Sequence, residues 1–331
     1  MKIVTPSVEI MRTGLGTDIN ILPEQFIEKV GRTCYKSEDK ITDDSAAKFV
    51  GNLIKRGHEA MIEHWNLIFK TDAGPFNEFK SDWNLLLQGS NIPLKERLRP
   101  YLRFTDCILE DGEIRHVISG NMRALRDYAK ACVEGFGFMP MYMWGMILNY
   151  PLFFPEYQDY VPPVFSNNIL MPINVCDLSE FERRIHQDVT MKFVCDRGVS
   201  HEMVRHRVAS FAQESTRYCN YGLDKFGKEI TVIRPSWCGQ DSDLYKRWHA
   251  GCRVAEDAYF ALLDEGATPQ EARSVLPNST KTEIIVTMNL DGWEHFFGLR
   301  DNPAAHPDMR EVAAMAHCMY EKQIETCEEA Y

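Results

Sequence analysis

Three arginines, a histidine and three hydroxyl residues lie within thirteen positions of this 331-residue chain. Arg205-His206-Arg207 is followed, after seven residues, by Ser215-Thr216-Arg217. The planar guanidinium group donates two parallel hydrogen bonds to a phosphate, and hydroxyl groups add further short donors. A solvated helix end would explain Arg-His-Arg alone. The added serine and third arginine favour a site for a phosphate or a dinucleotide.

The charge of the chain makes this basic cluster informative. The formal net charge is −11, with 37 Lys and Arg against 48 Asp and Glu. A general nucleic-acid binder needs an excess of basic residues on its binding face, so the composition argues against that class. A small anionic substrate needs only a local cluster. Hydrophobic residues make up 44% and charged residues 26%, the balance of a folded globular protein.

The chain carries no sign of export, a membrane span or a cysteine framework. Residues 1–14 lack the apolar segment and cleavage site of a secretory signal, and no run of about 18 apolar residues could cross a bilayer. None of the ten cysteines forms a C-x-x-C pair, which a zinc ribbon would need. We expect a cytoplasmic protein with reduced thiols and with no nucleic-acid or membrane partner.

Two histidine motifs resemble the zinc-protease pattern H-E-x-x-H without matching it. His201-Glu202 is followed by Arg205, and His206 comes one residue too late. Two residues five apart lie about 140° from each other around a helix, so they do not share a metal. His58-Glu59 is followed by Ile62 where the second ligand should stand. No metal site is predicted.

Helix-capping residues and hydrophobic periodicity in the sequence predict the helices and strands that position these residues. Residues 70–190 are rich in aromatic residues, proline and methionine, and show neither an internal repeat nor a linker. We expect a single catalytic domain over residues 1–331, of α/β (α+β) class, with a mixed sheet packed with helices and with residues 70–190 as a mostly helical or irregular insertion. Strands are predicted over 1–10 and 65–69, and helices from 43–45 to Gly57, over 119–135, from 199, from the capping box Thr268–Glu271, over 289–300 and from Pro307.

The arrangement R-H-R, seven residues, S-x-R resembles the signature of the flavin-dependent thymidylate synthases. Gly57-His58-Glu59 with Glu63-His64 is similar to that family's N-terminal element. The resemblance covers roughly residues 25–69 and 191–325, and the stretch between is absent from the compact members. Elements similar to the C-terminal ones follow in order: Arg273, Leu276-Pro277, Asn289, His295-Phe296 and Leu299-Arg300.

The resemblance implies a reaction and an assembly. The expected reaction converts dUMP, methylenetetrahydrofolate and NADPH into dTMP, tetrahydrofolate and NADP, with FAD relaying the hydride. The expected architecture is a homotetrameric α/β fold in which several subunits build each FAD site.

The resemblance also assigns roles to residues of this chain. The implied FAD contacts are His58, Ala60, Arg205, His206, Arg207, Ser210, Gln213, Asn289, Leu290, Asp291 and His295. The implied dUMP contacts are Glu202, Met203, Val204, Arg205, Gln213, Glu214, Ser215, Thr216, Arg217, Arg273 and Arg300.

Two positions depart from the family's pattern. Glu202 stands where glutamine is common, and a carboxylate near a nucleotide phosphate is unfavourable unless an arginine pairs with it. Asp291 stands where some members have arginine, which puts a direct contact of its side chain with FAD phosphate in doubt.

The catalytic residues are expected to be Arg300 and Ser215. None of the ten cysteines lies in the P-C-H setting of classical thymidylate synthases. No general base adjoins Ser215 in sequence, so we interpret its hydroxyl as a positioning donor rather than a nucleophile. Arg300 would stabilise negative charge on the uracil ring. A flavoenzyme acting on pyrimidine nucleotides without folate, and a non-catalytic nucleotide-binding regulator, are the alternative interpretations.

Overall fold

The computed structural model describes residues 1–14, 21–88, 98, 100–109, 111–160, 170–217 and 219–328. Its helices are α1 (Pro23–Tyr35), α2 (Ser45–Lys55), α3 (Ala73–Gln88), α5 (Met122–Phe136), α6 (Met141–Asn149), α7 (Glu180–His186), α8 (Arg197–Met203), α9 (Asp243–Asp264), α10 (Pro269–Ala272), α11 (Leu290–Arg300) and α12 (Pro307–Glu328). Its strands are β1 (Lys2–Val4), β2 (Ser7–Arg12), β3 (Asn66–Thr71), β4 (Leu102–Ile108), β5 (Ile114–Asn121), β6 (Met171–Pro172), β7 (Asp188–Asp196), β8 (Ser210–Gln213), β9 (Thr231–Ile233) and β10 (Lys281–Asn289).

Two four-stranded sheets and one strand pair organise these elements. The central sheet has the order β2-β7-β10-β8, and the second sheet has the order β4-β5-β3-β6. Among the residues that the structure describes, every neighbouring pair within both sheets is antiparallel, and only the separate pair β1–β9 is parallel. The α/β class is confirmed. The expected mixed sheet was wrong, because hydrophobic pattern predicts where a strand lies but not the direction of its neighbour.

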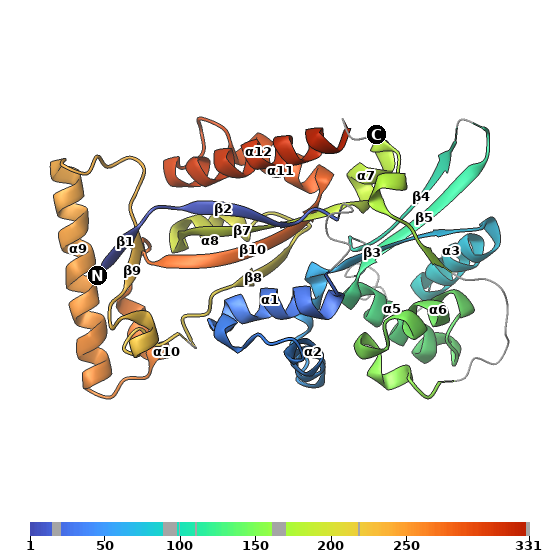
Figure 1. The fold of residues 1–331 in the computed structure, drawn as a ribbon, viewed down its shortest axis with the longest axis horizontal. Helices are drawn as coiled ribbons and strands as arrows, with labels where there is room; N and C mark the ends of the chain where they lie inside the picture. The colour runs from blue at the N-terminus through green and yellow to red at the C-terminus, as the bar shows by residue number, and fades with distance from the viewer. Residues whose placement is uncertain are drawn as a thin grey trace.

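The central sheet is packed between helices. Figure 1 shows α11 and α12 over one face and α1 beneath the other. Alternate residues of β7, including Met191 and Phe193, join Trp293 and Phe296 of α11 in one buried cluster. This alternation is the period of two that a strand imposes on its side chains. The aromatic residues of α11 therefore pack the helix onto the sheet. They are core residues and do not form a surface on which a ligand ring could stack.

Local signals in the sequence start and stop several helices as predicted. α2 begins at Ser45, and Gly57 follows it with φ +69°, a backbone conformation that favours glycine. The side chain of Thr268 and that of Glu271 form the predicted capping box of α10. Asn289 caps α11 by accepting a hydrogen bond from the amide of Gly292.

The segment predicted as a mostly helical or irregular insertion contains strands as well. β4 and β5 pair over their whole length, and β5 also pairs with β3. α3, α5 and α6 pack around a buried aromatic cluster that includes Phe79, Tyr128 and Tyr142, and Figure 1 shows these helices beside β3. The strands β4 and β5 were not predicted, because short runs of mixed polarity carry a weak periodic signal.

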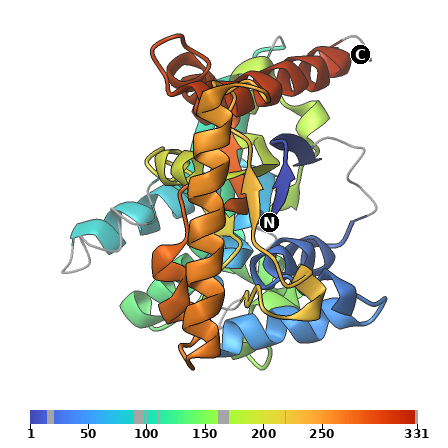
Figure 2. The same ribbon diagram turned by 90° about the vertical axis from the view of Figure 1, so that its left-hand side faces the viewer.

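The opposite end of the molecule is formed by β1, β9 and α9. Figure 2 shows α9 running alongside the strand pair. Trp248 of α9 donates a hydrogen bond to Ser279 at 2.9 Å, which attaches the helix to the chain just before β10. Across the described ranges, no helix is both long and apolar enough to span a membrane.

Candidate functional site

A cavity of about 280 Å³ lies where the two four-stranded sheets meet, and we call it the first cavity. Five predicted FAD contacts line it, although they come from segments up to 88 residues apart in sequence: Arg207, Ser210, Asn289, Asp291 and His295. The other lining residues include Glu63, Tyr101, Arg103, Asn121, Asp188 and Thr287.

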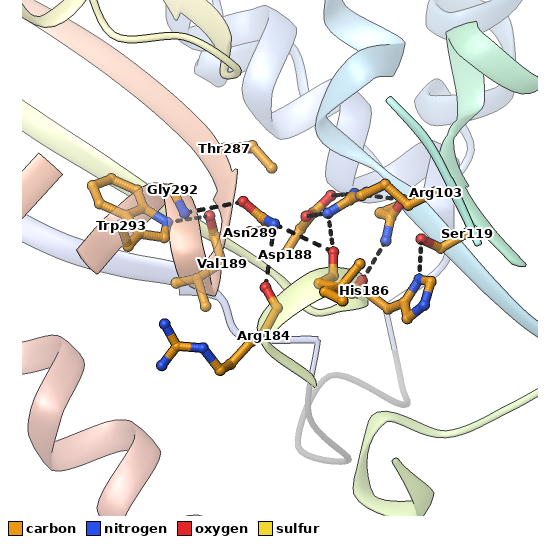
Figure 3. Close-up of polar contacts among 12 residues, drawn as sticks. Arg103, Ser119, Arg184, His186, Asp188, Val189, Thr287, Asn289, Gly292 and Trp293 are labelled. Carbon is orange, nitrogen blue, oxygen red and sulfur yellow. Dashed lines mark hydrogen bonds and ion pairs between the residues drawn. The ribbon is translucent and has the colours of Figure 1, made fainter. Parts of the chain in front are cut away.

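Asn289 is positioned by hydrogen bonds on both ends of its amide. Its oxygen accepts from the Gly292 amide at 3.1 Å, and its nitrogen donates to the carbonyls of Arg184 and Ile185 at 3.2 and 3.3 Å (Figure 3). A Cβ on Gly292 would lie 3.0 Å from the asparagine oxygen, so glycine permits this close capping contact. The N-terminus of α11, which carries Asp291 and His295, is fixed at the edge of the first cavity.

Arg103 joins the inserted segment to the central sheet. Its guanidinium donates to both oxygens of Asp188 at 2.8 and 2.9 Å, to the Ile185 carbonyl at 2.6 Å and to the Asn66 oxygen at 3.3 Å (Figure 3). Ile185 therefore accepts hydrogen bonds from both Arg103 and Asn289. Close by, buried His186 is hydrogen-bonded to Ser119 at 2.7 Å. The result is a continuous polar network below the first cavity.

Arg207 and Ser210 line the cavity in different ways. The exposed side chain of Arg207 forms no hydrogen bond or ion pair with any residue in the part of the chain that the structure describes. Ser210 is buried and donates to Glu63 at 3.0 Å, while Glu63 pairs with Arg123 at 2.5 Å. Arg207 is thus the cation of this cavity that is available to an anionic ligand.

Arg300, His206 and Glu202 form one cluster beside the first cavity. Nε of Arg300 donates to Nε2 of His206 at 2.7 Å, and Nη1 contacts the Glu202 carboxylate at 2.7 Å. Nη2 also reaches the Glu202 carbonyl at 3.4 Å, so three of the five guanidinium N–H groups are used and two remain. The His206 ring lies edge-on to that of His295, with 6.3 Å between ring centroids.

His206 must be neutral to accept this hydrogen bond. Burial, together with the neighbouring Arg300 and His295, lowers the pKa of His206 to about 4. The charge of the cluster therefore resides on Arg300 and Glu202. Their ion pair supplies the arginine partner that a carboxylate at position 202 requires near a nucleotide.

A second cavity, of about 300 Å³, collects part of the predicted dUMP contacts. Arg273 donates to buried Thr216 at 3.2 Å. Arg197 and His201 share the lining, and Nη1 of Arg197 is buried without a hydrogen-bond partner among the described residues. The lining contains cations and hydroxyl groups without a carboxylate, which suits a phosphate.

The residues between the two cavities are held by β8 and the loop after it. Gln213 donates to Ser200 at 2.8 Å and to Thr282 at 3.1 Å. Glu214 is buried and pairs with Lys281 at 2.9 Å. The Ser215 amide donates to the Cys34 carbonyl at 3.0 Å, and its hydroxyl accepts from the amide of Arg217 at 3.4 Å.

Several predicted contacts lie away from both cavities. His58 and Ala60 are exposed at the start of the 3₁₀ helix Glu59–His64, and neither lines the first or second cavity. The side chains of Met203 and Leu290 are buried in the core beneath α11. Val204 and Arg205 are exposed after α8. His64 is fully buried and hydrogen-bonded to Thr287 at 2.7 Å.

The cavity-lining residues that sequence reasoning missed include Glu63, Arg103, Asn121 and Arg197. One signal was available for Asn121. It follows a strand and caps the next helix, as Asn289 does. For Arg103 no local signal exists, because its partner Asp188 lies 85 residues away in sequence.

Buried histidines predict a loss of stability in mild acid. Burial lowers the pKa of His64 and of His186 to about 3, and that of His206 to about 4. The unfolded chain binds these protons near pH 6.5 and the folded chain does not, so stability is complete above pH 6.5 and falls as pH decreases towards 4. We expect the melting temperature to fall by about 5 °C or more from pH 7 to pH 5.

The control for this expectation is a histidine outside the buried set. His186→Gln should give a shallower dependence of melting temperature on pH, whereas His249→Gln, on α9, should retain the wild-type dependence. A wild-type melting temperature that is constant from pH 7 to pH 5 would contradict the assignment of neutral buried histidines.

Comparison with known proteins finds a family match over the C-terminal part of the chain. Residues 179–324 match the family model described as thymidylate synthase complementing protein. The flavin-dependent thymidylate synthase of Pyrococcus furiosus is 40% identical over 119 residues, which are 36% of this chain and 48% of that protein. The enzyme of the same name from Geobacter sulfurreducens is 40% identical over 120 residues, 35% of this chain and 49% of that protein. The chain thus spans about half the length of these curated relatives.

One solved structure also matches part of the chain. It is the UMP/dUMP methylase PolB from Streptomyces cacaoi bound with 5-Br dUMP, with a TM-score of 0.34 and 24% identity over 42% of this chain and 67% of that one. A TM-score this low does not assign a role to any residue. The range that the family model matches, residues 179–324, contains Arg205, Ser215, Arg273, Asn289 and Arg300.

Proposed function

We propose that this protein is a flavin-dependent thymidylate synthase, which methylates dUMP to dTMP with methylenetetrahydrofolate as carbon donor and NADPH-reduced FAD as hydride source. One observation carries the proposal. Arg300, at the end of α11, is hydrogen-bonded to His206 of the Arg-His-Arg segment, 94 residues away in sequence. The signature and the C-terminal element of the resemblance thereby form one polar cluster.

The proposed dUMP site combines the second cavity with Arg300. Arg273, Arg197 and Thr216 would bind the phosphate, because their donors converge there without a competing carboxylate. The two remaining N–H groups of Arg300 would donate to a uracil oxygen and stabilise negative charge while the ring carbon attacks the methylene group. Ser215 would orient the nucleotide through its hydroxyl. No base lies within hydrogen-bonding distance of that hydroxyl among the described residues, which supports this role.

The first cavity has donors that suit part of FAD. Arg207 is a cation without a partner in the described chain, and it lies in the same cavity as the capped N-terminus of α11. Asp291 pairs with Arg184 at 2.8 Å, which offsets its charge where a phosphate would approach. When bound, FAD would supply the hydride that converts the transferred methylene group into a methyl group.

The size of the first cavity bears on assembly. About 280 Å³ is at the lower limit of sites that enclose small ligands, so it would hold only part of a dinucleotide. The remainder would lie on a neighbouring chain, in keeping with the homotetramer that the resemblance implies. Exposed His58 and Ala60 would then contact FAD of another chain.

Absorbance spectroscopy tests the flavin part of this proposal. Purified protein incubated with FAD and passed through a desalting column should retain the flavin absorbance, and NADPH should bleach it faster when dUMP is present. Protein that cannot be loaded with FAD would overturn the proposal. Turnover of dUMP that needs no folate would instead favour a flavoenzyme of a different reaction.

A further inference from the structure

Three lysines and two glutamates meet where the chain leaves β8. They come from the end of α1, from β7, from β10 and from the loop after β8, and we call them the lysine–glutamate network: Lys36, Lys192, Glu214, Lys281 and Glu283. Nζ of Lys281 lies 2.9 Å from the Glu214 carboxylate and 2.5 Å from that of Glu283. Lys36 pairs with Glu283 and lies 4.0 Å from Glu214. Lys192 pairs with Glu283 at 3.0 Å.

Lys281 is the main counter-ion of Glu214, because it is the lysine of the network that contacts this carboxylate closely. Burial alone would lower the pKa of Lys281, but Glu214 and Glu283 outweigh burial and raise it. Burial alone would raise the pKa of Glu283, but Lys281 and Lys36 outweigh burial and lower it to about 2. The side chain of Glu214 is only 3% exposed, so water does not replace Lys281 as its partner.

The ion pair of Lys281 with Glu214 links two of the segments that line the second cavity. One of these segments, residues 273–278, ends three residues before Lys281. The other contains Thr216, two residues after Glu214. Arg273 donates to Thr216 at 3.2 Å and is a further link between the same segments. The width of the second cavity therefore depends on this ion pair as well as on that hydrogen bond.

The loop after β8 is also attached to the end of α1, which lies beneath β8 in Figure 1. The Ser215 amide donates to the Cys34 carbonyl at 3.0 Å. Cys34 belongs to the last turn of α1, where carbonyl groups have no partner within the helix. Lys36 is the C-cap of the same helix. The loop is thus held by its backbone at Ser215 and by the side chain of Glu214.

Burial gives Glu214 a different role from the direct dUMP contact that the resemblance implies. Its side chain lines neither the first nor the second cavity. A buried carboxylate that loses its cation is strongly destabilised, so Glu214 without Lys281 would move towards water. Residue 214 can move only together with its neighbours Ser215 and Thr216. The ion pair therefore determines where these two hydroxyl groups lie.

We propose that Lys281 is a positioning residue of the nucleotide site, which holds Glu214 in the interior and so fixes Thr216 at the second cavity together with Ser215. This inference rests on the proposed function. The ligand that depends on Lys281 is dUMP and not FAD, because no member of the lysine–glutamate network lines the first cavity.

The test measures the dissociation constant for dUMP by calorimetry and that for FAD by flavin fluorescence, with the melting temperature recorded for each variant. Lys281→Met should bind dUMP about tenfold or more weakly and FAD as tightly as wild type, because Glu214 loses its counter-ion. Lys281→Gln keeps a donor without the charge and should bind dUMP about fivefold more weakly. It replaces Lys281→Met if that variant does not fold.

Two further variants separate positioning from a general loss of structure. Lys281→Arg keeps a cation for both carboxylates and should bind dUMP within about threefold of wild type. Lys192→Met is the matched control, because Lys192 pairs with Glu283 of the same network and forms no ion pair with Glu214 among the described residues. It should also bind dUMP within about threefold of wild type, even where its melting temperature falls.

The outcomes separate this inference from the proposed function. Wild-type protein that binds no dUMP overturns the proposed function and this inference with it. Wild-type protein that binds dUMP only as tightly as Lys281→Met and Lys281→Gln overturns the positioning role alone. The positioning role is also overturned if Lys192→Met weakens dUMP binding equally, if FAD binding falls in parallel, or if Lys281→Arg binds dUMP no better than Lys281→Met.

Discussion

Arg300→Ala is expected to reduce dTMP formation by about a hundredfold or more at saturating dUMP, folate and NADPH. The guanidinium retains two N–H groups after bonding His206 and Glu202, and these are the donors proposed for the uracil ring. Losing one such donor in a site that excludes water costs about 3 kcal/mol. Arg300→Lys should recover little, because a point charge cannot maintain contacts with His206, Glu202 and the ring together.

Ser215→Ala separates this role from nucleophilic catalysis. A neutral positioning hydrogen bond contributes about 0.5–1.5 kcal/mol, so this variant should retain a measurable rate. Arg310→Ala, an exposed arginine on α12, is the control and should be fully active. The opposite ranking of Ser215→Ala and Arg300→Ala, or a trapped serine–uracil adduct, would refute the assignment.

Arg207→Ala is expected to lose most of its bound FAD. Arg207 has no partner among the described residues and lines the first cavity, so its hydrogen bonds are available for a phosphate of the cofactor. Hydrogen bonds to charged groups contribute about 1.5–3 kcal/mol, which corresponds to a loss of about 10- to 100-fold in affinity. The measurement is the flavin absorbance per chain after desalting, together with the dissociation constant for added FAD.

The control for Arg207→Ala is an exposed arginine that lines neither cavity. Arg247 is exposed on α9, at the end of the molecule formed by β1 and β9 (Figure 2). Arg247→Ala should retain wild-type flavin content. Unchanged FAD affinity in Arg207→Ala would remove the first cavity from the proposed flavin site.

The sequence allowed local features of the site to be predicted because they depend on local chemistry. The N-cap of α11 at Asn289, the capping box at Thr268 and the stop at Gly57 each follow from a few neighbouring residues. The same holds for the Arg-His-Arg segment, whose spacing to Ser215 is continuous in sequence.

Contacts between distant segments could not be predicted in the same way. The bond between Arg300 and His206 spans 94 residues, and that between Arg103 and Asp188 spans 85. Each depends on which strands pair and in which direction, and hydrophobic pattern leaves both undetermined. For this reason the sequence did not show that the inserted segment lines the first cavity. Asn121 nevertheless caps the helix that follows it, as Asn289 does.

The two residues that depart from the family's pattern, Glu202 and Asp291, each form an ion pair with an arginine. Glu202 pairs with Arg300 at 2.7 Å, and Asp291 pairs with Arg184 at 2.8 Å. Each carboxylate is offset by a cation, so neither presents an unpaired negative charge to a phosphate. Arg184 and Arg300 therefore compensate for acidic residues at positions where uncharged or basic ones would be expected.

Transfer of a labelled carbon tests the central proposal most directly. Purified protein is incubated with dUMP, NADPH, FAD and methylenetetrahydrofolate carrying ¹³C in its methylene group, and the nucleotide product is analysed by mass spectrometry. We expect dTMP that contains the label, formed only when both FAD and folate are present. Turnover of dUMP without label in the product, or no product from protein fully loaded with FAD, would contradict the assignment of this chain as a flavin-dependent thymidylate synthase.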